Sequence, residues 1–192
     1  FTTVFDQRLW GSDESASGMG SELSSGQVAH AMTLLRRMIP ELGIRSIADV
    51  PCGDFNWIPV LLREHPEIDY RGYDIVPALV NENRSRHPAH VFSVLDITRQ
   101  SPDRVDLIFT KDLINHLSEK DIWSTLKNMV ESQSSYLMIT NNTGMCNVDL
   151  EPSQAHASRY VDLLTSPYDM PEPIYADHYF LIWPLTAQSV SY

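Results

Sequence analysis

The chain has 192 residues, 43% of them hydrophobic and 20% charged, which suits one α/β domain with a sizeable core and argues against both two domains and a disordered chain. Its formal net charge is −11, and its 14 lysines and arginines are scattered, so the surface repels phosphates and the composition argues against a nucleic-acid substrate. No stretch approaches the roughly 18 apolar residues of a membrane-spanning helix, so no membrane association is expected.

The two cysteines, Cys52 and Cys146, are too few for a disulfide framework. The chain begins at Phe1 rather than at a methionine, and we expect a processed or trimmed fragment whose upstream sequence is unknown. No basic stretch followed by an apolar run is visible at the start, so no signal peptide is predicted. The expected location is the reducing cytoplasm, and residues 1–192 are expected to form a single domain.

The N-terminal segment is rich in glycine and serine. Residues 11–26 read GSDESASGMGSELSSG, a composition typical of a loop rather than a core element. We therefore expect a flap over about residues 8–26. Pro40 is expected to end the helix that follows, whose predicted apolar face comprises Val28, Ala31, Met32, Leu35, Met38 and Ile39.

Five short apolar runs then alternate with helical patterns. This alternation predicts an α/β fold with a Rossmann-like, doubly wound sheet of about seven mostly parallel strands and helices on both faces. The last stretch, residues 174–185, predicts either a closing hairpin or one long edge strand. The five runs are residues 46–50, 68–75, 90–97, 105–112 and 136–142.

Local signals place the helices between these runs. Pro77 suits the first turn of the helix after the second strand, and Ser118 with Asp121 forms a capping pattern before the helix after the fourth. The predicted apolar faces are Phe55, Ile58, Leu61 and Leu62 after the first strand, and Ile122, Leu126, Met129 and Val130 after the fourth.

The first predicted strand runs into the sequence DVPCGDFNW at residues 49–57. An acid, a turn of small residues and a helix start are typical of a cofactor-binding turn at the carboxyl end of a strand. Gly53 allows a ligand to approach the backbone closely. Neither GxGxxG nor GxxxxGK[ST] is present, so the turn favours a ligand without phosphates.

Two further acids follow the next two strands. Asp74 ends the second strand, where an ionised carboxylate suits the paired hydroxyls of a ribose. Asp96 follows the third strand and can accept a hydrogen bond from an exocyclic amine such as that of adenine. Together with Asp49, these carboxylates also suit a cationic cofactor.

The order of these motifs resembles that of class I S-adenosylmethionine-dependent methyltransferases, since DVPCGDFNW is followed by GYDIVP, LDIT and DLIFTKDLINHLS. More narrowly, the chain resembles a microbial branch with a D-x-P-C-G-D-F-x-W first motif and an N-terminal W-x-x-x-E-S-x-S-G-x-G-S element, here Trp10 to Ser21. The resemblance covers roughly residues 8–185. The first motif departs from the commoner E/D-x-G-x-G pattern because Pro51 and Cys52 stand at glycine positions.

This resemblance implies S-adenosylmethionine as the cofactor and assigns residues to its parts. Asp49 and Gly53 would line the methionine part, Asp74 would hold the ribose, and Asp96 with Ile97 would flank the adenine. Cys52 is expected to be a packing residue rather than a nucleophile. The other candidate cofactor contacts are Trp10, Ser15, Ser17 and Gly18 of the flap, together with Pro51, Cys52, Ile75 and Lys111.

The end of the fourth strand is the expected catalytic region. Holding donor and acceptor in line can contribute about 7–11 kcal/mol, and a positioned base adds about 10²–10⁴-fold when the acceptor must lose a proton. His116 is the candidate base, and Asp112, four residues earlier, could orient it or bind the acceptor. A histidine satisfied by local hydrogen bonds is the competing interpretation.

The same resemblance suggests an acceptor side in the polar segment after the fifth strand, although simple loop residues would look the same. His156 and His178 could reach that side but lack metal-ligand spacing, so no metal is predicted. A divalent ion held by Asp112 and Asp149 is left open. The candidate substrate-binding residues are Asn147, Asp149 and Arg159.

The sequence therefore predicts methyl transfer to an oxygen or nitrogen of a small-molecule, glycan or peptide acceptor, without identifying the acceptor or the oligomeric state. A nucleotide-sugar dehydrogenase or epimerase would need a glycine-rich phosphate turn or a Tyr-x-x-x-Lys pair, and the sequence has neither. The alternative is a non-catalytic module that binds the cofactor or a partner on the same fold. The presence of every expected cofactor-site acid argues against that alternative.

Overall fold

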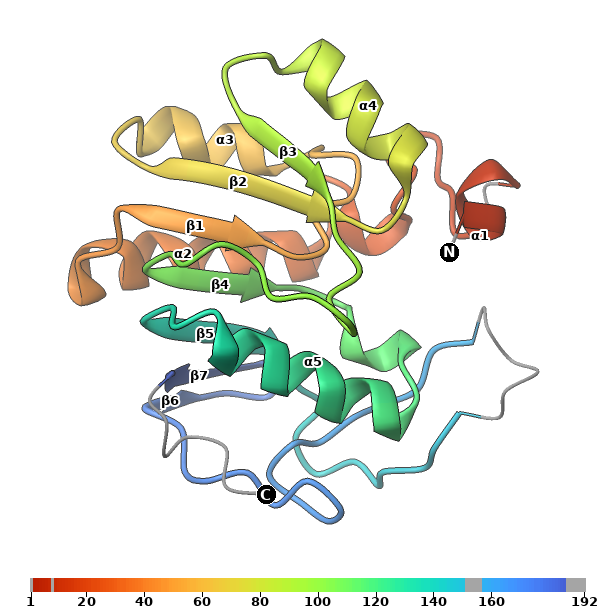
Figure 1. The fold of residues 1–192 in the computed structure, drawn as a ribbon, viewed down its shortest axis with the longest axis vertical. Helices are drawn as coiled ribbons and strands as arrows, with labels where there is room; N and C mark the ends of the chain where they lie inside the picture. The colour runs from red at the N-terminus through yellow and green to blue at the C-terminus, as the bar shows by residue number, and fades with distance from the viewer. Residues whose placement is uncertain (1, 8, 151–156, 186–192) are drawn as a thin grey trace. The chain divides into compact units, whose positions relative to one another are not determined.

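The computed structural model describes residues 2–7, 9–150 and 157–185. Its strands form a seven-stranded sheet in the order β3-β2-β1-β4-β5-β7-β6. The elements, labelled in Figure 1, are the strands β1 (Ser46–Asp49), β2 (Asp69–Asp74), β3 (Val91–Val94), β4 (Leu107–Thr110), β5 (Tyr136–Thr140), β6 (Tyr175–Ala176) and β7 (Phe180–Pro184), the helices α1 (Thr2–Asp6), α2 (Gly26–Leu42), α3 (Ile58–Glu64), α4 (Pro77–Arg86) and α5 (Glu119–Glu131), and the 3₁₀ turns η1 (Met19–Ser21) and η2 (Ile114–His116).

The described residues fall into two compact units, which we describe one at a time. The first unit lies within residues 1–47 and 52–94, and the second within residues 48–51 and 95–192. Strand β1 contributes residues to both units, and β4 to β7 belong to the second.

In the first unit, helix α2 has a capping residue at each end. The hydroxyl of Ser25 accepts a hydrogen bond from the N–H two residues further on. Gly43 ends the helix in the left-handed conformation, with φ of 65°, and its N–H donates to the carbonyl of Ile39. The prediction that Pro40 ends the helix was wrong, because Pro40 lies inside the last turn. The chain reverses only at Gly43, where a residue without a side chain can take the required φ.

Phe55 also differs from the sequence prediction, which placed it on the face of a helix. It lies ahead of α3 and adopts φ of 56°. Its fully buried ring packs against an aromatic cluster at centroid distances of 4.7 to 5.4 Å. The turn after β1 is therefore anchored by packing before the helix begins; the cluster comprises Tyr70, His87, His90 and Phe92.

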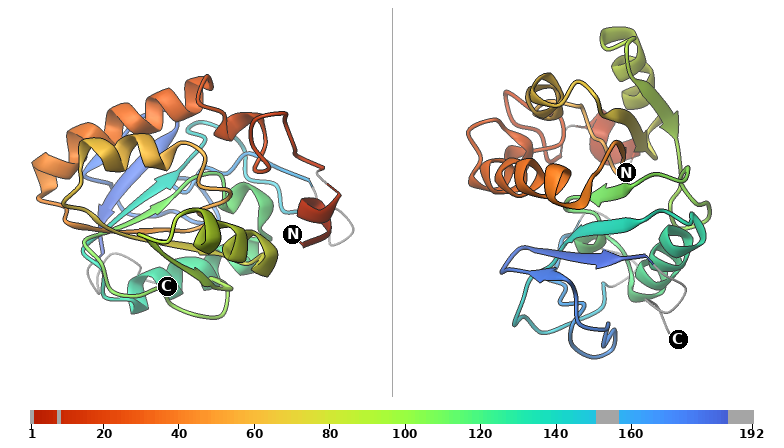
Figure 2. Two further views of the ribbon diagram at one scale, coloured as in Figure 1. Left: turned by 90° about the horizontal axis from the view of Figure 1, so that it is seen from above. Right: turned by 90° about the vertical axis from the view of Figure 1, so that its left-hand side faces the viewer.

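Strands β2 and β3 pair in parallel, with Arg71 opposite Val91 and Asp74 opposite Val94. Helix α4 packs against both strands and is seen beside β3 in Figure 2. It begins at Pro77, which confirms the predicted helix start. The carboxyl end of β2, where Asp74 lies, thus leads directly into a helix.

In the second unit, β4 and β5 pair in parallel and β7 runs antiparallel to β5. Strands β6 and β7 form the hairpin, the first of the two arrangements predicted for residues 174–185. Figure 1 shows this hairpin at the side of β5. The centre of the unit is apolar, and its fully buried side chains include Ile108, Phe109, Met138, Phe180 and Ile182.

Helix α5 confirms the predicted cap. The hydroxyl of Ser118 accepts a hydrogen bond from the N–H of Asp121 at 3.2 Å and donates one to its carboxylate at 2.8 Å. Three of the four residues of its predicted apolar face, Ile122, Leu126 and Met129, are buried. The mixed seven-stranded sheet with intervening helices confirms the predicted α/β, Rossmann-like class. Across the described ranges, no helix combines the length and the apolar character needed to cross a membrane.

Candidate functional site

In the first unit, one carboxylate ties the turn after β1 to the end of β2. Gly53 adopts φ of 54°, in the left-handed region that favours glycine. Its N–H donates to Oδ2 of Asp74 at 3.2 Å, and the N–H of Val76 donates to Oδ1 at 3.0 Å. The structure thus brings together two residues that the sequence predicted for a cofactor site.

The Asp74 carboxylate lies in a buried environment, since the residue is only 6% exposed. Burial raises the pKa of Asp74 above its ordinary value, and hydrogen bonds from backbone N–H groups, including those of Val76 and Gly53, partly offset this. A carboxylate offers about four acceptor positions. Asp74 can therefore still accept a hydrogen bond from a ligand hydroxyl, which would stabilise its ionised form.

Helix α4 holds the other side of the same turn. The side-chain amide of Asn83 donates to the carbonyl of Gly53 at 2.7 Å and lies 3.8 Å from Sγ of Cys52. Cys52 is buried and forms no disulfide bond, an environment that suits the expected packing role. Ile75, also predicted as a cofactor contact, is 40% exposed and lies between the end of β2 and the start of α4.

The sequence did not single out Asp54, yet its carboxylate holds the N-terminal segment. Oδ1 accepts hydrogen bonds from the hydroxyls of Ser15 and Ser17 at 3.1 and 3.2 Å, and Oδ2 accepts one from the N–H of Ala16 at 2.7 Å. Two predicted flap residues, Ser15 and Ser17, are therefore bound to the first motif. Asp54 lies in that motif beside Gly53, which was the available signal, but its partners are more than 35 residues away in sequence.

Trp10 and Gly18, the other predicted flap residues, lie against each other. Gly18 adopts φ of 97°, and a Cβ at this position would come within 2.8 Å of the Trp10 carbonyl oxygen. Both the conformation and the close approach therefore require glycine here. The chain therefore folds back on itself between residue 10 and residue 18.

The second unit contains the other predicted cofactor acids. Asp49, the last residue of β1, is buried. Asp96 uses Oδ1 to accept hydrogen bonds from the N–H and the hydroxyl of Thr98, at 3.1 and 2.6 Å. This local turn occupies part of the carboxylate that the sequence assigned to an adenine. Ile97 is buried and Pro51 is half-buried.

Beyond β4, the carboxylate of Asp112 is held from two sides. The Lys111 ammonium donates to Oδ2 and the Tyr179 hydroxyl donates to Oδ1, both at 2.6 Å. The backbone of Asp112 is also constrained, because it adopts φ of 55° and its N–H donates to Oγ1 of Thr140 at 3.0 Å. Lys111 is buried, so its charge is neutralised by Asp112 inside the protein.

Tyr179 is the second functional candidate that the sequence analysis missed. Burial, followed by the negative charge of Asp112, raises the pKa of the Tyr179 phenol well above its ordinary value. The phenol therefore stays protonated and serves as a donor to Asp112. Because Tyr179 follows Asp112 by 67 residues and reaches it only through the β6–β7 hairpin, no local pattern could have predicted this pair.

His116 lies in η2, and its Nδ1 is 3.2 Å from the carbonyl oxygen of Ala157. Burial lowers the pKa of His116 below its ordinary value, while the Ala157 carbonyl and the charge of Asp112 act in the opposite direction. The imidazole is therefore neutral near pH 7. A carbonyl facing Nδ1 favours the tautomer with its proton there, which leaves Nε2 as the proton acceptor.

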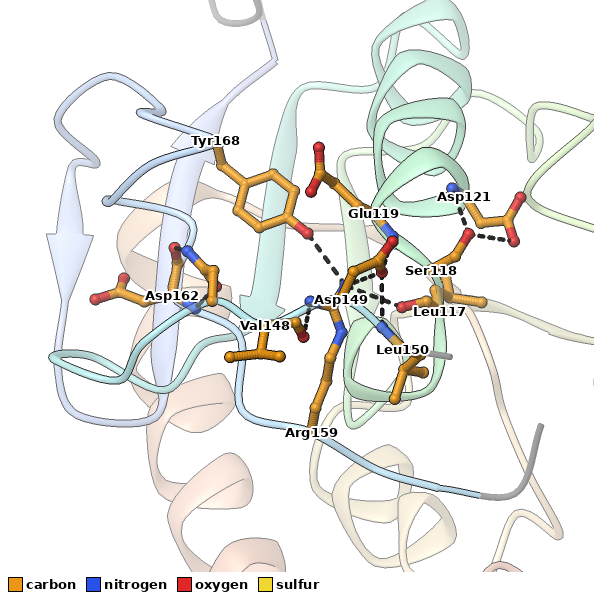
Figure 3. A network of polar contacts seen from close by, with 11 residues as sticks. Leu117, Ser118, Glu119, Asp121, Val148, Asp149, Leu150, Arg159, Asp162 and Tyr168 are labelled. Atoms are coloured by element: carbon orange, nitrogen blue, oxygen red, sulfur yellow. Dashed lines mark hydrogen bonds and ion pairs between the residues drawn. The ribbon is translucent and has the colours of Figure 1, made fainter. Parts of the chain in front are cut away.

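Arg159 is the centre of a polar network in the second unit (Figure 3). Its guanidinium donates to the carbonyls of Val148 and Leu117 at 2.7 and 3.1 Å and to the Tyr168 hydroxyl at 3.2 Å. The Asp149 carboxylate lies 3.5 Å from the guanidinium and accepts a hydrogen bond from the first N–H of α5. Two of the predicted acceptor-side residues, Asp149 and Arg159, are thus brought together.

Asn147, the third predicted acceptor-side residue, makes a different set of contacts. Its side-chain amide donates to the carbonyls of Asp162 and Ser166 at 2.8 and 2.9 Å, and its oxygen accepts from the N–H of Asp162 at 2.9 Å. The hydrogen bonds join the segment after β5 to the turn before β6. This arrangement resembles the anchoring of a loop more than a group displayed for a ligand.

The sequence left open a divalent ion held by Asp112 and Asp149. In the structure the Asp112 carboxylate contacts Lys111, and the Asp149 carboxylate contacts Arg159. Within residues 2–7, 9–150 and 157–185, no group of three His, Cys, Asp or Glu side chains is arranged to hold a metal ion. His156, considered for the acceptor side, lies outside the described residues.

Sequence comparisons relate about half of the chain to a methyltransferase. No family model matches the chain. Over 90 residues it is 33% identical to a trans-aconitate 2-methyltransferase of Escherichia coli strain UMN026, and 34% identical to the protein of that name from strain IAI39. The match covers 46% of this chain and 35% of each relative, so the chain spans about a third of the length of the curated relatives it matches.

Structural comparisons relate the fold to solved methyltransferase structures. The methyltransferase domain of bacterial CtHen1-CN aligns with a TM-score of 0.52 at 13% identity, covering 58% of this chain and 65% of that one. The methyltransferase domain of bacterial CtHen1-C aligns with a TM-score of 0.51 at 14% identity, covering 64% of this chain and 70% of that one. At these identities the likeness concerns the fold alone, and it agrees with the Rossmann-like α/β class of the sheet.

Proposed function

We propose that this chain is an S-adenosylmethionine-dependent methyltransferase acting on an oxygen or nitrogen of a small-molecule, glycan or peptide acceptor. The observation that carries the proposal is the buried Asp74 carboxylate, which is tied to the left-handed Gly53 at the end of β2. The fold shared with CtHen1 methyltransferase domains and the partial sequence match to trans-aconitate 2-methyltransferases support the same proposal.

The residues of the first unit fit this cofactor chemically. Asp74 has acceptor capacity left for a ribose hydroxyl, and the N–H of Gly53 holds one of its carboxylate oxygens in place. The turn lacks a phosphate-binding glycine pattern, and the cofactor has no phosphate. When bound, S-adenosylmethionine supplies an electrophilic methyl group on a cationic sulfur. Nearby carboxylates would stabilise that positive charge. Asp49 and Asp96, which belong to the second unit, stay predictions from the sequence.

On the acceptor side, we propose that His116 removes a proton from the acceptor. Asp112 would orient the His116 imidazole for this step. The lowered pKa of His116 supports the first role, because only the neutral imidazole can accept a proton. The Lys111 and Tyr179 contacts support the second, because they hold the Asp112 carboxylate in one place. Asn147, Asp149 and Arg159 would shape the acceptor side through the loops that they hold.

The name of the matched relatives bears on the class of acceptor. Trans-aconitate is a carboxylic acid, and a carboxylate is already deprotonated at neutral pH. A carboxylate acceptor would need no general base, and His116 would then contribute through position alone. An alcohol or amine acceptor would need the base, so the pH dependence of turnover separates the two acceptor classes.

Calorimetry with S-adenosylmethionine and its demethylated product tests the proposal. We expect micromolar affinity, about −8 kcal/mol, and we expect Asp74→Ala to weaken it by about 1.5–3 kcal/mol because a charged hydrogen bond is lost. Asp69→Ala, an exposed acid at the start of the same strand, is the matched control and should bind normally. If the wild-type chain binds neither S-adenosylmethionine nor its demethylated product, the proposal is wrong.

The alternative is a module that binds the cofactor or a partner without catalysis. Incubation with cofactor labelled on its methyl group, followed by mass spectrometry of candidate metabolites, distinguishes the two. Transfer of label to any acceptor supports the enzyme, whereas tight binding without transfer across acids, alcohols, amines and peptides supports the module.

A further inference from the structure

Asp54 binds three consecutive residues of the N-terminal segment (residues 11–26) with one carboxylate. Its two oxygens accept hydrogen bonds from Ser15, Ala16 and Ser17 at 2.7 to 3.2 Å. The contact is reciprocal, because Oγ of Ser17 accepts a hydrogen bond from the N–H of Asp54 at 3.1 Å. Ser15 is 1% exposed, so this part of the segment is buried against the rest of the unit.

A second anchor holds the same segment two residues further along the first motif. The side-chain amide of Asn56 donates to the Glu14 carboxylate at 2.7 Å and to the carbonyl of Ser21 at 3.1 Å. The same Glu14 oxygen accepts a hydrogen bond from the N–H of Leu23 at 2.7 Å. The first motif therefore fixes the N-terminal segment at its middle and near its end.

These contacts place Ser17 directly against Gly53. A Cβ built on Gly53 would collide with the Ser17 side chain, so the serine occupies the space that any larger residue at this turn would fill. The N–H of the same glycine donates to Asp74. One short path of contacts thus connects the N-terminal segment, the turn of the first motif and the carboxylate proposed to hold the cofactor.

We propose that Asp54 is a positioning residue for the cofactor site: its carboxylate fixes Ser15 to Ser17 across Gly53, so that the N-terminal segment forms a fixed wall beside Asp74. The inference rests on the proposed function, because it assigns the wall to the cofactor described there. It differs from a freely mobile flap, since the segment is bound to the motif through charge-assisted hydrogen bonds. Its effect should appear in the retention of the cofactor.

Two measurements on the whole chain test this inference. In Asp54→Ala, amide hydrogen exchange at Ser15 to Gly18 should accelerate about tenfold or more, because the acceptor of the segment is gone. The affinity for S-adenosylmethionine should fall about 10- to 100-fold, the equivalent of charged hydrogen bonds. Stopped-flow binding should locate the loss in a faster dissociation rate, with the association rate within about threefold.

Asp13→Ala is the matched control, since Asp13 is an exposed acid of the same segment, and it should leave both readouts unchanged. Asp54→Asn keeps one acceptor oxygen for the Ala16 N–H and should recover part of the affinity. If Asp54→Ala does not fold, Ser17→Ala removes one partner of the carboxylate and should show the same changes at smaller size.

The possible failures are distinguishable. A wild-type chain that does not bind the cofactor overturns the proposed function and this inference with it. Normal wild-type binding combined with unchanged affinity in Asp54→Ala overturns this inference alone, whether or not exchange accelerates. An affinity loss that comes entirely from a slower association rate would also overturn the inference. That pattern would indicate that fewer protein molecules can bind the cofactor, and not that bound cofactor is held less firmly.

Discussion

At the scale of single residues, the burial of His116 determines the pH dependence expected of the proposed base. Burial lowers its pKa below the ordinary 6.5, so the fraction of neutral imidazole at pH 7 is larger than for an exposed histidine. For an acceptor that must lose a proton, turnover should rise with pH through this lowered pKa and level off at a lower pH than with an exposed histidine as the base. His116→Ala should lower turnover about 10²–10⁴-fold and abolish the rise, as measured by initial rates from pH 5 to 8.

The control for this experiment is His65→Ala, a histidine of the first unit that pairs with Glu67. It should keep both the rate and the pH profile. Near-normal turnover and a flat profile in His116→Ala would reject the base and favour a carboxylate acceptor. Loss of cofactor affinity in that variant would instead show that His116 belongs to the cofactor side.

Tyr179 makes a residue-scale prediction of a different kind. Tyr179→Phe removes the hydroxyl that donates to Asp112 but keeps the ring, which packs edge-on against Phe180 at 4.8 Å. Lys111 still holds the other carboxylate oxygen, so we expect a partial loss, about 1–2 kcal/mol or roughly tenfold in turnover. Cofactor affinity should change less than about twofold. Tyr160→Phe, at an exposed position, is the matched control, and equal losses in both variants would show that the hydroxyl of Tyr179 has no special role.

At the scale of elements, Asn147 joins the segment after β5 to the turn before β6. Its side chain makes hydrogen bonds in both directions with Asp162 and donates to Ser166, so Asn147→Ala should cost about 1–3 kcal/mol of unfolding free energy. In urea unfolding, the midpoint should fall while the slope stays the same. Asn81→Ala, at an exposed position of α4, should stay within about 0.5 kcal/mol of the wild type. Unchanged stability together with a raised KM for the acceptor would indicate that Asn147 contacts substrate directly.

At the scale of the whole molecule, binding should stabilise the fold by mass action. A ligand present at 100 times its dissociation constant adds about 2.7 kcal/mol, and for a chain of this size each kcal/mol raises Tm by about 2–4 °C. S-adenosylmethionine should therefore raise Tm by about 5–11 °C in a thermal scan. Adenosine triphosphate is a suitable control, because the first motif lacks a phosphate-binding pattern; an equal shift with this nucleotide would contradict the assignment of the turn.

The alternation of apolar runs and helical patterns was enough to predict the sheet, and local caps predicted the helix starts at Pro77 and Ser118, whereas for residues 174–185 the sequence left a hairpin and a long edge strand as alternatives. The sheet and the helix starts follow from periodicity or from a cap of a few residues, so neighbouring residues carry the signal. The acids Asp49 and Asp74 could be placed at strand ends for the same reason. The wrong prediction at Pro40 also came from a local signal. Both a proline and a left-handed glycine can end a helix, and here the helix ends at Gly43.

What the sequence determined by itself was therefore the order of elements and the residue types at the carboxyl ends of the strands. Only the tertiary structure decided which partners those residues have: Asp54 with Ser15 to Ser17, Asp112 with Tyr179, and Asp149 with Arg159. Each of these pairs joins segments that are separated in the chain by 10 to 67 residues. Hydrogen bonds and ion pairs act over a few ångströms, so they depend on how packed segments meet and not on any repeat along the chain.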